Sequence, residues 1–323
     1  MIVRTIQRSE RERVLELLAE WISADFFRRY FDHDPAFRDD LCLVAEEDDG
    51  RFVATLQIMP KTVRIDGREL RVGGIGNVFT TESYRHKRVA SQLLTRAIER
   101  MEEERFDLSL LFASRLTFYG QFGWGGHRRL LAGITPPPEP TATASTTLRR
   151  FESGRDLDTV MRIYDSYSRA LNGPVARDRR YWEGQLRYAG APDETFLLAE
   201  RSGEVAAYMR FVDLYGAYTV MEHAALSNGR DALLDLLGVA AERSRERGFF
   251  LFHLGAEPGL EAALTGRGFG VNEVEDVFWM WRVISPGAVA QKLGLTADAV
   301  EHADFFERIL PYRGSVYWTS DRF

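Results

Sequence analysis

An internal repeat constrains the fold of this chain more than any other feature. The order of predicted elements in residues 1–134 returns in residues 148–284: strand, two helices, three antiparallel strands, helix, strand, helix. The corresponding segments are 2–23 with 148–170, 41–59 with 196–211, 90–105 with 231–248, and 110–125 with 251–270. We therefore predict a tandem duplication of one α/β (α+β) domain, built on a mixed and mostly antiparallel sheet flanked by helices.

A proline-rich stretch separates the two copies. Residues 135–147 contain three consecutive prolines followed by small polar residues, which continue neither a helix nor a sheet. We expect a first domain over 1–134, a linker over 135–147 and a second domain over 148–284. Residues 285–323 remain as a tail with two short helices, which we expect to reach back toward the first domain.

Composition limits the class of protein and its partners. With 45% apolar and 28% charged residues, the 323-residue chain has the balance of a globular protein of two domains. No run of about 18 apolar residues exists, and the first residues are charged too early for a signal peptide, so we expect a soluble cytoplasmic protein. The net charge of -6 argues against a nucleic-acid surface. We expect a small-molecule substrate, no nucleic-acid or membrane partner, and leave a homo-oligomer open.

Metal and thiol chemistry are not expected. The single cysteine, Cys42, lies in the apolar stretch LCLVAE and is predicted to be a buried structural thiol. No Cys and His residues have the spacing of a zinc site. Acidic clusters at 32–34, 39–40 and 46–49 are typical of solvated loops, and a cation site is the alternative.

A basic turn at the start of a helix is the first candidate binding site. The strand ending at Thr80 is followed by Arg85, His86, Lys87 and Arg88, and a helix begins directly after them. Exposed backbone N–H groups and the positive end of the helix dipole favour an anion at such a junction, so a pyrophosphate would fit. A basic surface turn without a ligand is the alternative.

This turn resembles motif A of the GNAT superfamily of N-acetyltransferases, Q/R-x-x-G-x-G/A. Arg85 and Ala90 match the first and last positions, but Arg88 stands where the first glycine is expected, at a point where the backbone approaches phosphate closely. The resemblance implies an acetyl-CoA site in which the loop holds the pyrophosphate and the preceding strand pairs with the pantetheine arm. The residues assigned in this way are Val78, Phe79, Thr80, Arg85, His86, Lys87, Arg88, Val89, Ala90 and Ser91.

A second motif, LLFASRLTFYGQFGW, resembles the Eis-like (enhanced intracellular survival) acetyltransferases, in which A-S-E precedes I-Y-G-R-F-G-Y. The likeness extends to residues 176–186 and to the tail, although the family's sterol-carrier-like third domain is reduced to about its final helix and terminal peptide. It implies that Ser114 contacts coenzyme A and that the Tyr119 hydroxyl is the general acid for the departing thiolate. A packed core aromatic is the alternative for Tyr119. His127, just beyond, is expected on the surface.

The end of the sequence supplies a second catalytic candidate. In Eis-like proteins the terminal carboxylate is the general base, so the resemblance assigns this role to the α-carboxylate of Phe323. A terminal residue that is merely packed is the alternative, and Asp321 is the nearest side-chain candidate. For the acceptor we expect Trp21, Asp25 and Phe27 in the first helix pair, although a helix at a core edge shows the same pattern.

The second copy lacks both chemical features of the first. When the two long helices are paired, Asp231 corresponds to Arg88, so an acidic side chain stands where phosphate would lie. Leu264 corresponds to Tyr119. We therefore expect the second domain to be structural or to shape the substrate pocket.

Together these features predict tandem GNAT (acyl-CoA N-acyltransferase) domains that transfer an acetyl group from acetyl-CoA, the co-substrate, directly to a primary amine of a small molecule. Polyamines and aminoglycoside-like compounds are examples of such acceptors. Two alternatives stay open: a GNAT enzyme acting on a peptide or thiol-precursor amine, and a catalytically silent CoA-binding regulator or scaffold.

Overall fold

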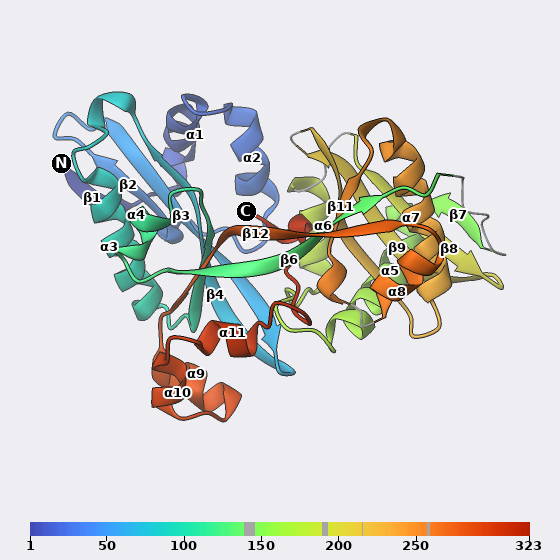
Figure 1. Ribbon diagram of the computed structural model, residues 1–323. Coiled ribbons are helices and arrows are strands. Elements are labelled where there is room, and N and C mark those ends of the chain that lie inside the picture. The colour runs from blue at the N-terminus through green and yellow to red at the C-terminus, as the bar shows by residue number, and fades with distance from the viewer. Residues whose placement is uncertain (139–145, 189–192, 215, 257–258) are drawn as a thin grey trace.

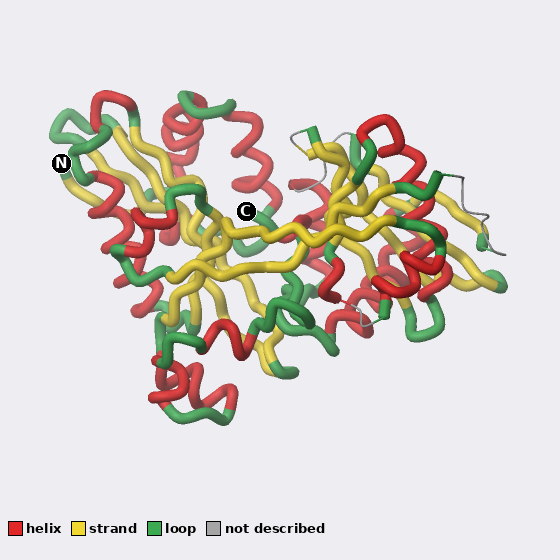
Figure 2. The backbone as a smooth tube through the Cα atoms, viewed as in Figure 1, coloured by secondary structure: helices red, strands yellow, loops and turns green. Residues whose placement is uncertain are grey.

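One continuous sheet runs through both halves of the molecule. The structure is a computed structural model that describes residues 1–138, 146–188, 193–214, 216–256 and 259–323. Within these ranges twelve strands form a sheet in the order β1-β2-β3-β4-β5-β12-β6-β11-β10-β9-β8-β7. Helices flank the sheet in each half (Figure 1, Figure 2). Only β4 with β5 and β10 with β11 are parallel, so the predicted mixed, mostly antiparallel sheet is confirmed.

The first half contains the predicted elements and one more. Its strands are β1 (Ile2–Thr5), β2 (Cys42–Glu46), β3 (Phe52–Ile65), β4 (Arg68–Thr80), β5 (Leu108–Phe112) and β6 (Gly125–Thr135). Its helices are α1 (Arg11–Ala19), α2 (Ala24–His33), α3 (Val89–Glu103) and α4 (Leu116–Gly120). The additional strand is β6, whose first residues, GGHRR, show no alternation of apolar and polar side chains.

The second half repeats this order. Its strands are β7 (Thr147–Arg150), β8 (Thr195–Arg201), β9 (Glu204–Leu214), β10 (Ala217–Ala225), β11 (Phe250–Phe252) and β12 (Gly270–Val283). Its helices are α5 (Ser153–Ser168), α6 (Arg179–Tyr188), α7 (Arg230–Ser244) and α8 (Leu260–Gly266). Of the predicted linker 135–147, residues 139–145 lie outside the described ranges.

The last strands of the two halves are exchanged. Strand β12 of the second half pairs with β5 of the first, with Met280 opposite Leu111. Strand β6 of the first half pairs with β11 of the second, with Gly133 opposite Leu251. Since β6 and β12 also pair with each other, each half completes its sheet with a strand from the other. Hydrogen bonding therefore crosses the predicted boundary between the first and second domains.

The exchange also corrects the expectation for His127. It lies in β6 opposite Trp279 and is half-buried instead of lying on the open surface. Desolvation lowers the pKa of its imidazole, so the ring is neutral at neutral pH.

Helix α3 packs on the sheet through the predicted apolar stripe of Leu93, Leu94, Ala97 and Met101, all of them buried. The approach of α3 to β4 requires a glycine, because a Cβ atom at Gly73 would lie 2.5 Å from the Met101 Sδ atom. Gly73 therefore sets the distance between α3 and β4, the two elements that later border the candidate site.

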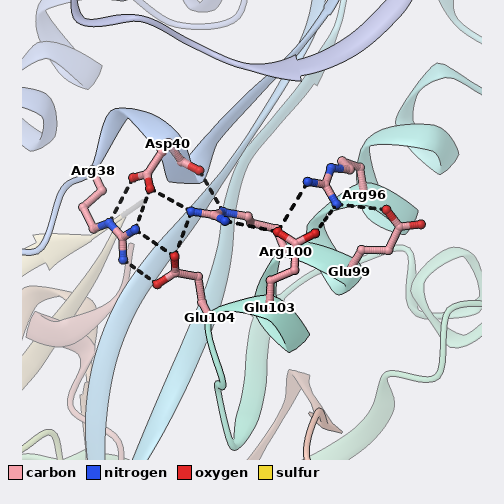
Figure 3. Close-up of polar contacts among 7 residues, drawn as sticks. All are labelled: Arg38, Asp40, Arg96, Glu99, Arg100, Glu103 and Glu104. Atoms are coloured by element: carbon pink, nitrogen blue, oxygen red, sulfur yellow. Dashed lines mark hydrogen bonds and ion pairs between the residues drawn. The ribbon is translucent and has the colours of Figure 1, made fainter.

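A network of ion pairs fixes the C-terminal end of α3 (Figure 3). Arg100 Nη2 lies 2.8 Å from Asp40 Oδ2 and 2.8 Å from Glu104 Oε1. Arg38 binds the same two carboxylates. The network continues along the helix through Arg96, Glu99 and Glu103. A single exposed pair contributes little, but charges shared in a network hold the helix against the segment before β2 more effectively.

Residues 285–309 pack on the first half. They contain α9 (Pro286–Leu293), α10 (Ala297–Glu301) and α11 (Phe305–Ile309), one helix more than predicted. Val289, Val300 and Phe305 share a buried cluster with Val72 of β4 and Leu108 of β5. After α11 the chain passes through a turn at residues 312–314 and a short 3-10 helix at Thr319–Asp321, and Figure 1 marks its end between the two halves.

Contacts also decide the interpretation of Cys42 and the acidic clusters. Cys42 is buried, and desolvation raises the pKa of its thiol to about 12, which confirms a structural thiol. The acidic clusters are solvated only in part: the Asp48 and Asp49 side chains are 94% and 61% exposed, as predicted, whereas other members are engaged inside the fold. Asp34 is buried, with Oδ2 3.3 Å from Lys61 Nζ, and Asp39 Oδ1 lies 2.5 Å from Arg11 Nε.

No helix within the described ranges is long and apolar enough to cross a membrane.

Candidate active site

The parallel strands β4 and β5 separate at one end of the first half. Their pairing ends with Ile75 opposite Leu111, whereas β4 continues to Thr80. Between these points Asn77 has a left-handed backbone, with φ of 52°, and the register of β4 against β3 shifts. A bulge of this kind bends a strand away from its neighbour. The result is an opening between the end of β4 and the end of β5.

A cavity of about 780 Å³ occupies this opening. Its lining residues come from the end of β4, the N-terminal end of α3, the segment after β5, α4 and the turn after α1. They are Trp21, Val78, Phe79, Thr80, Tyr84, Arg85, His86, Arg88, Val89, Ala90, Ser91, Phe112, Ala113, Ser114, Arg115, Phe118 and Tyr119. The residues expected to contact acetyl-CoA therefore all line one cavity, except Lys87. The ammonium of Lys87 lies 4.6 Å from the ring centroid of Tyr84.

The start of α3 explains the unusual residue in the basic turn. Arg88 is the N-cap of the helix and has φ of 61°, and His86 has φ of 64°. Glycine adopts these left-handed conformations more easily than other residues, so the position of the expected glycine does require such a backbone. The side chains of His86 and Arg88 make no hydrogen bond or ion pair with the described part of the chain. Arg85 donates only a long bond, of 3.4 Å, to the Thr80 carbonyl. The guanidinium groups of Arg85 and Arg88 are available to an anion at the helix N-terminus.

Tyr119 has the properties of a proton donor. Its ring is half-buried on α4, with its centroid 5.1 Å from that of Phe118. Desolvation raises the pKa of the Tyr119 phenol, against the opposing effect of the Arg115 cation. The phenol is therefore protonated at neutral pH, and its hydroxyl has no hydrogen-bond partner within the described ranges. Packing and proton donation are thus compatible roles for the same ring.

Of the three expected acceptor residues, the structure brings only Trp21 to the cavity. Trp21 is 52% exposed and stacks on Phe79, with ring centroids 6.3 Å apart and an interplanar angle of 10°. Phe27 is buried in the core behind it, with its ring 5.7 Å from that of Trp21. Asp25 is exposed in the first turn of α2 and does not line the cavity.

Phe323 borders the cavity without lining it. A Cβ atom at Gly74 would lie 2.3 Å from the Cζ atom of the Phe323 ring. The ring centroid is 5.1 Å from that of Phe112, which does line the cavity. Asp321, the side-chain alternative, is fully buried, with Oδ2 2.7 Å from Arg177 Nη2, so it does not face the cavity.

The charged side chains that line the cavity are all basic. No aspartate or glutamate is among its described lining residues. Arg115, which the sequence analysis does not single out, follows Ser114 directly, and its side chain has no ion-pair partner in the parts of the chain that are described. The signal that could have identified Arg115 in the sequence is its position directly after Ser114. Tyr84 and Phe112 were missed because an aromatic residue in a turn or at a strand end looks like core. The described residues include no group of His, Cys, Asp or Glu arranged to hold a metal ion.

The corresponding region of the second half is filled. A Cβ atom at Gly229 would lie 2.3 Å from the Ala206 carbonyl oxygen, so β9 covers the start of α7. Trp318 is fully buried between the ends of β10 and β11, with its ring centroid 4.8 Å from that of His223 and 5.3 Å from that of His253.

Comparison with known proteins agrees with the fold. Residues 2–126 match the profile of the acetyltransferase (GNAT) domain family. A comparison with curated proteins returned no match.

Several solved structures share the fold of both halves. A probable N-acyltransferase from Enterococcus faecalis V583 is 16% identical, with a TM-score of 0.71 over 90% of this chain and 74% of that one. A GCN5-related N-acetyltransferase from Anabaena variabilis is 14% identical, with a TM-score of 0.67 over 88% and 73%. Eis1 from Mycobacterium abscessus is 16% identical, with a TM-score of 0.61 over 89% and 75%.

The separated strands, the bulge in β4 and the cationic start of α3 all lie within residues 2–126, the part of the chain that matches the family profile. The first half therefore contains a GNAT acetyltransferase domain. The chain as a whole shares its fold with the Enterococcus structure and with Eis1.

Proposed function

We propose that the cavity binds acetyl-CoA and that the enzyme transfers its acetyl group directly to a primary amine. The observation that carries the proposal is that one cavity connects the start of α3, the opening between β4 and β5, and the Tyr119 hydroxyl. The first-turn amides of α3, with Arg85 and Arg88, suit the pyrophosphate. The end of β4, which β5 leaves unpaired, suits the extended pantetheine arm.

Acetyl-CoA supplies the thioester, whose carbonyl carbon receives the amine. In the transfer a C–N bond forms and the C–S bond breaks. Backbone N–H groups near Val78, beside the bulge of β4, polarise the carbonyl oxygen as charge develops on it. Tyr119 donates its phenolic proton to the sulfur as the thiolate leaves. Ser114 contacts the coenzyme beside Tyr119.

For the general base we propose the α-carboxylate of Phe323, which accepts the proton of the attacking amine. A base is needed because an aliphatic amine has a pKa of about 10 and is mostly protonated at neutral pH. Support comes from the position of the Phe323 ring against Gly74 and Phe112, beside the point where β4 and β5 separate. Asp321 is excluded by its burial under Arg177.

We propose a small-molecule amine as the acceptor, held at an aromatic rim formed by Trp21 and Phe79. The charge distribution also favours a second candidate. Arg115 lines the cavity, and the Arg322 guanidinium lies 4.7 Å from the ring centroid of Phe112. Two cations and no lining carboxylate disfavour a polycation such as a polyamine or aminoglycoside. They favour an amine with a neutral or acidic body, such as a peptide N-terminus or a thiol-precursor amine.

The test is release of free thiol from acetyl-CoA over a matched panel of polyamine, aminoglycoside, amino-acid and peptide amines. We expect release with at least one acceptor, and faster release with acceptors of low positive charge. Binding of acetyl-CoA without release by any amine would contradict transfer and support the scaffold alternative. Preference for polycations would contradict the second acceptor candidate.

A further inference from the structure

The C-terminal peptide reaches the first half by way of the second. Val316 donates its backbone N–H to Asn172 O at 2.9 Å, and Arg129 donates to the carbonyl of Tyr317. Trp318 then fills the space between β10 and β11. Five residues later the ring of Phe323 lies on β4. The second half, together with Arg129 of the exchanged strand β6, therefore holds the segment that leads directly to the cavity.

Arg177, in the loop before α6, is the centre of this attachment. Its Nη2 atom lies 2.7 Å from Asp321 Oδ2, 2.7 Å from Glu222 Oε2 and 3.2 Å from Ser320 Oγ. All four side chains are buried. The guanidinium carbon also lies 4.1 Å from the ring centroid of Tyr164, which restricts it from one face. One cation thus joins β10 of the second half to the peptide near its end.

Further bonds leave Asp321 little freedom. Its Oδ1 atom accepts a bond of 2.9 Å from the Tyr181 hydroxyl. Gln185 Nε2 donates to the backbone carbonyl of Ser320 at 2.9 Å. The two donors, Tyr181 and Gln185, lie four residues apart on one face of α6. Asp321 and Ser320 are therefore held by a helix and a loop of the second half, at backbone as well as side-chain atoms.

Stability alone gives a poor reason for this network. Burial raises the pKa of Asp321, against the opposing attraction of Arg177, so its charge is held at an electrostatic cost. A buried ion network of this kind adds little net stability compared with apolar residues of the same volume. Its specific effect is geometric, because it admits one position of the peptide. Two residues beyond Asp321, the Phe323 ring fits against β4 only because residue 74 is glycine.

We infer that Arg177 and Asp321 are positioning residues, through which the second half sets the C-terminal peptide, and with it Phe323, at the acetyl-transfer site of the first. This inference rests on the proposed function. It gives the half whose equivalent opening is filled by Trp318 a role in the reaction of the other.

The test compares Asp321→Asn with Asp235→Asn. Asp235 is an equally buried aspartate of the second half, 2.7 Å from Arg267, that does not contact the peptide. In Asp321→Asn we expect kcat to fall by roughly a hundredfold, the loss typical of a misplaced reacting group, with the acetyl-CoA Kd unchanged. In Asp235→Asn we expect a similar fall in melting temperature and an unchanged kcat.

Hydrogen exchange provides a readout that does not depend on activity. Amides of residues 316–323 should exchange faster in Asp321→Asn than in the wild type or in Asp235→Asn. Gly74→Ala, which displaces the Phe323 ring directly, should lower kcat without this change in exchange, and should be non-additive with Asp321→Asn.

Wild-type kcat in Asp321→Asn, equal losses in the two aspartate variants, or unchanged exchange of 316–323 would each overturn the inference. A wild-type protein that releases no thiol overturns the proposed function instead, and the exchange experiment then still decides whether Asp321 holds the peptide.

Discussion

The two halves of this protein have the same fold but differ in what lies between their parallel strands. In the first half, β4 and β5 open onto a cavity of about 780 Å³. In the second, the space between β10 and β11 holds Trp318, which is fully buried. The same fold therefore offers a cavity only where its own chain leaves the opening free.

The first turns of the two long helices, α3 and α7, also differ: one is open to a cavity and the other is covered. The first turn of α3 lines the cavity below an N-cap, Arg88, with a left-handed backbone. The first turn of α7 is covered by β9 at Gly229, and Asp231 lies 3.6 Å from both Arg201 and Arg267. An anion at the start of α7 would meet the Asp231 carboxylate, whereas at the start of α3 it would meet basic side chains such as Arg85 and Arg88.

The two short helices that follow have the same backbone and different chemistry. Trp124 N donates to Tyr119 O at 3.4 Å in the first half, and Phe269 N donates to Leu264 O at 3.1 Å in the second. Leu264 therefore takes the structural place of Tyr119, as the repeat predicts, and it is buried in the core. The hydroxyl is not needed to form this turn, which supports a role for it in chemistry.

Removing this hydroxyl should have the largest effect. Tyr119→Phe is expected to lower kcat by roughly 10²- to 10⁴-fold, with little change in acetyl-CoA affinity, because the proton is needed only as the sulfur departs. Tyr119→Leu, which copies the second half, should do the same, and Leu264→Phe is the matched control. A wild-type rate for Tyr119→Phe, measured with the best acceptor, would return Tyr119 to a packing role.

The pH dependence sharpens this prediction. Since burial raises the pKa of Tyr119 above its ordinary value, the acid form persists through neutral pH. Ionisation of the phenol should therefore cause no loss of kcat below about pH 10, the ordinary pKa of tyrosine. A basic limb centred well below this pH, and absent from Tyr119→Phe, would contradict the direction of the shift.

Changes at the end of the peptide should come next. Deleting Phe323, or extending the chain beyond it by a few residues, is expected to reduce acetyl transfer by roughly a hundredfold, the contribution of a positioned base. Binding of acetyl-CoA, measured by calorimetry, should stay intact. Full activity of a protein extended at this end would exclude the carboxylate and leave a side chain or water as the base.

A smaller effect is expected at the anion site. Arg85→Ala should weaken acetyl-CoA binding about tenfold, since a charge-assisted contact to phosphate is lost. The thermal shift produced by acetyl-CoA should fall accordingly. Arg230→Ala, at the start of α7, should leave that shift unchanged, and equal effects of the two substitutions would mean that the site is assigned to the wrong helix or to neither.

The smallest effect should follow from relieving the backbone at Arg88. Arg88→Gly is expected to raise the free energy of unfolding by roughly 0.5 to 1 kcal/mol, because a left-handed backbone suits glycine. Arg88→Ala keeps the strain and should give no gain in chemical denaturation. If the Arg88 side chain binds phosphate, both variants lose acetyl-CoA affinity equally; tighter binding by Arg88→Gly alone would show that arginine crowds the ligand.

Local patterns were enough to predict the parts of the site that lie on one stretch of chain. The apolar stripe of α3, the basic turn before it and the strand that ends at Thr80 are adjacent in sequence, so periodicity and motif spacing describe their geometry. The same holds for Ser114 and Tyr119, which follow β5 within seven residues. Sequence by itself thus determined the fold class, the duplication and most of the cavity lining.

The tertiary structure alone decided how distant segments complete that site. The exchange of β6 and β12, the burial of Asp321 by Arg177 and the contact of Phe323 with Gly74 join residues more than a hundred positions apart. Such pairings depend on the shape and charge of both partners, and neither partner's local sequence records them. For this reason Asp321 was a candidate base in the sequence and is an anchor in the fold, and His127 was a surface residue in the sequence and is part of a strand shared by both halves.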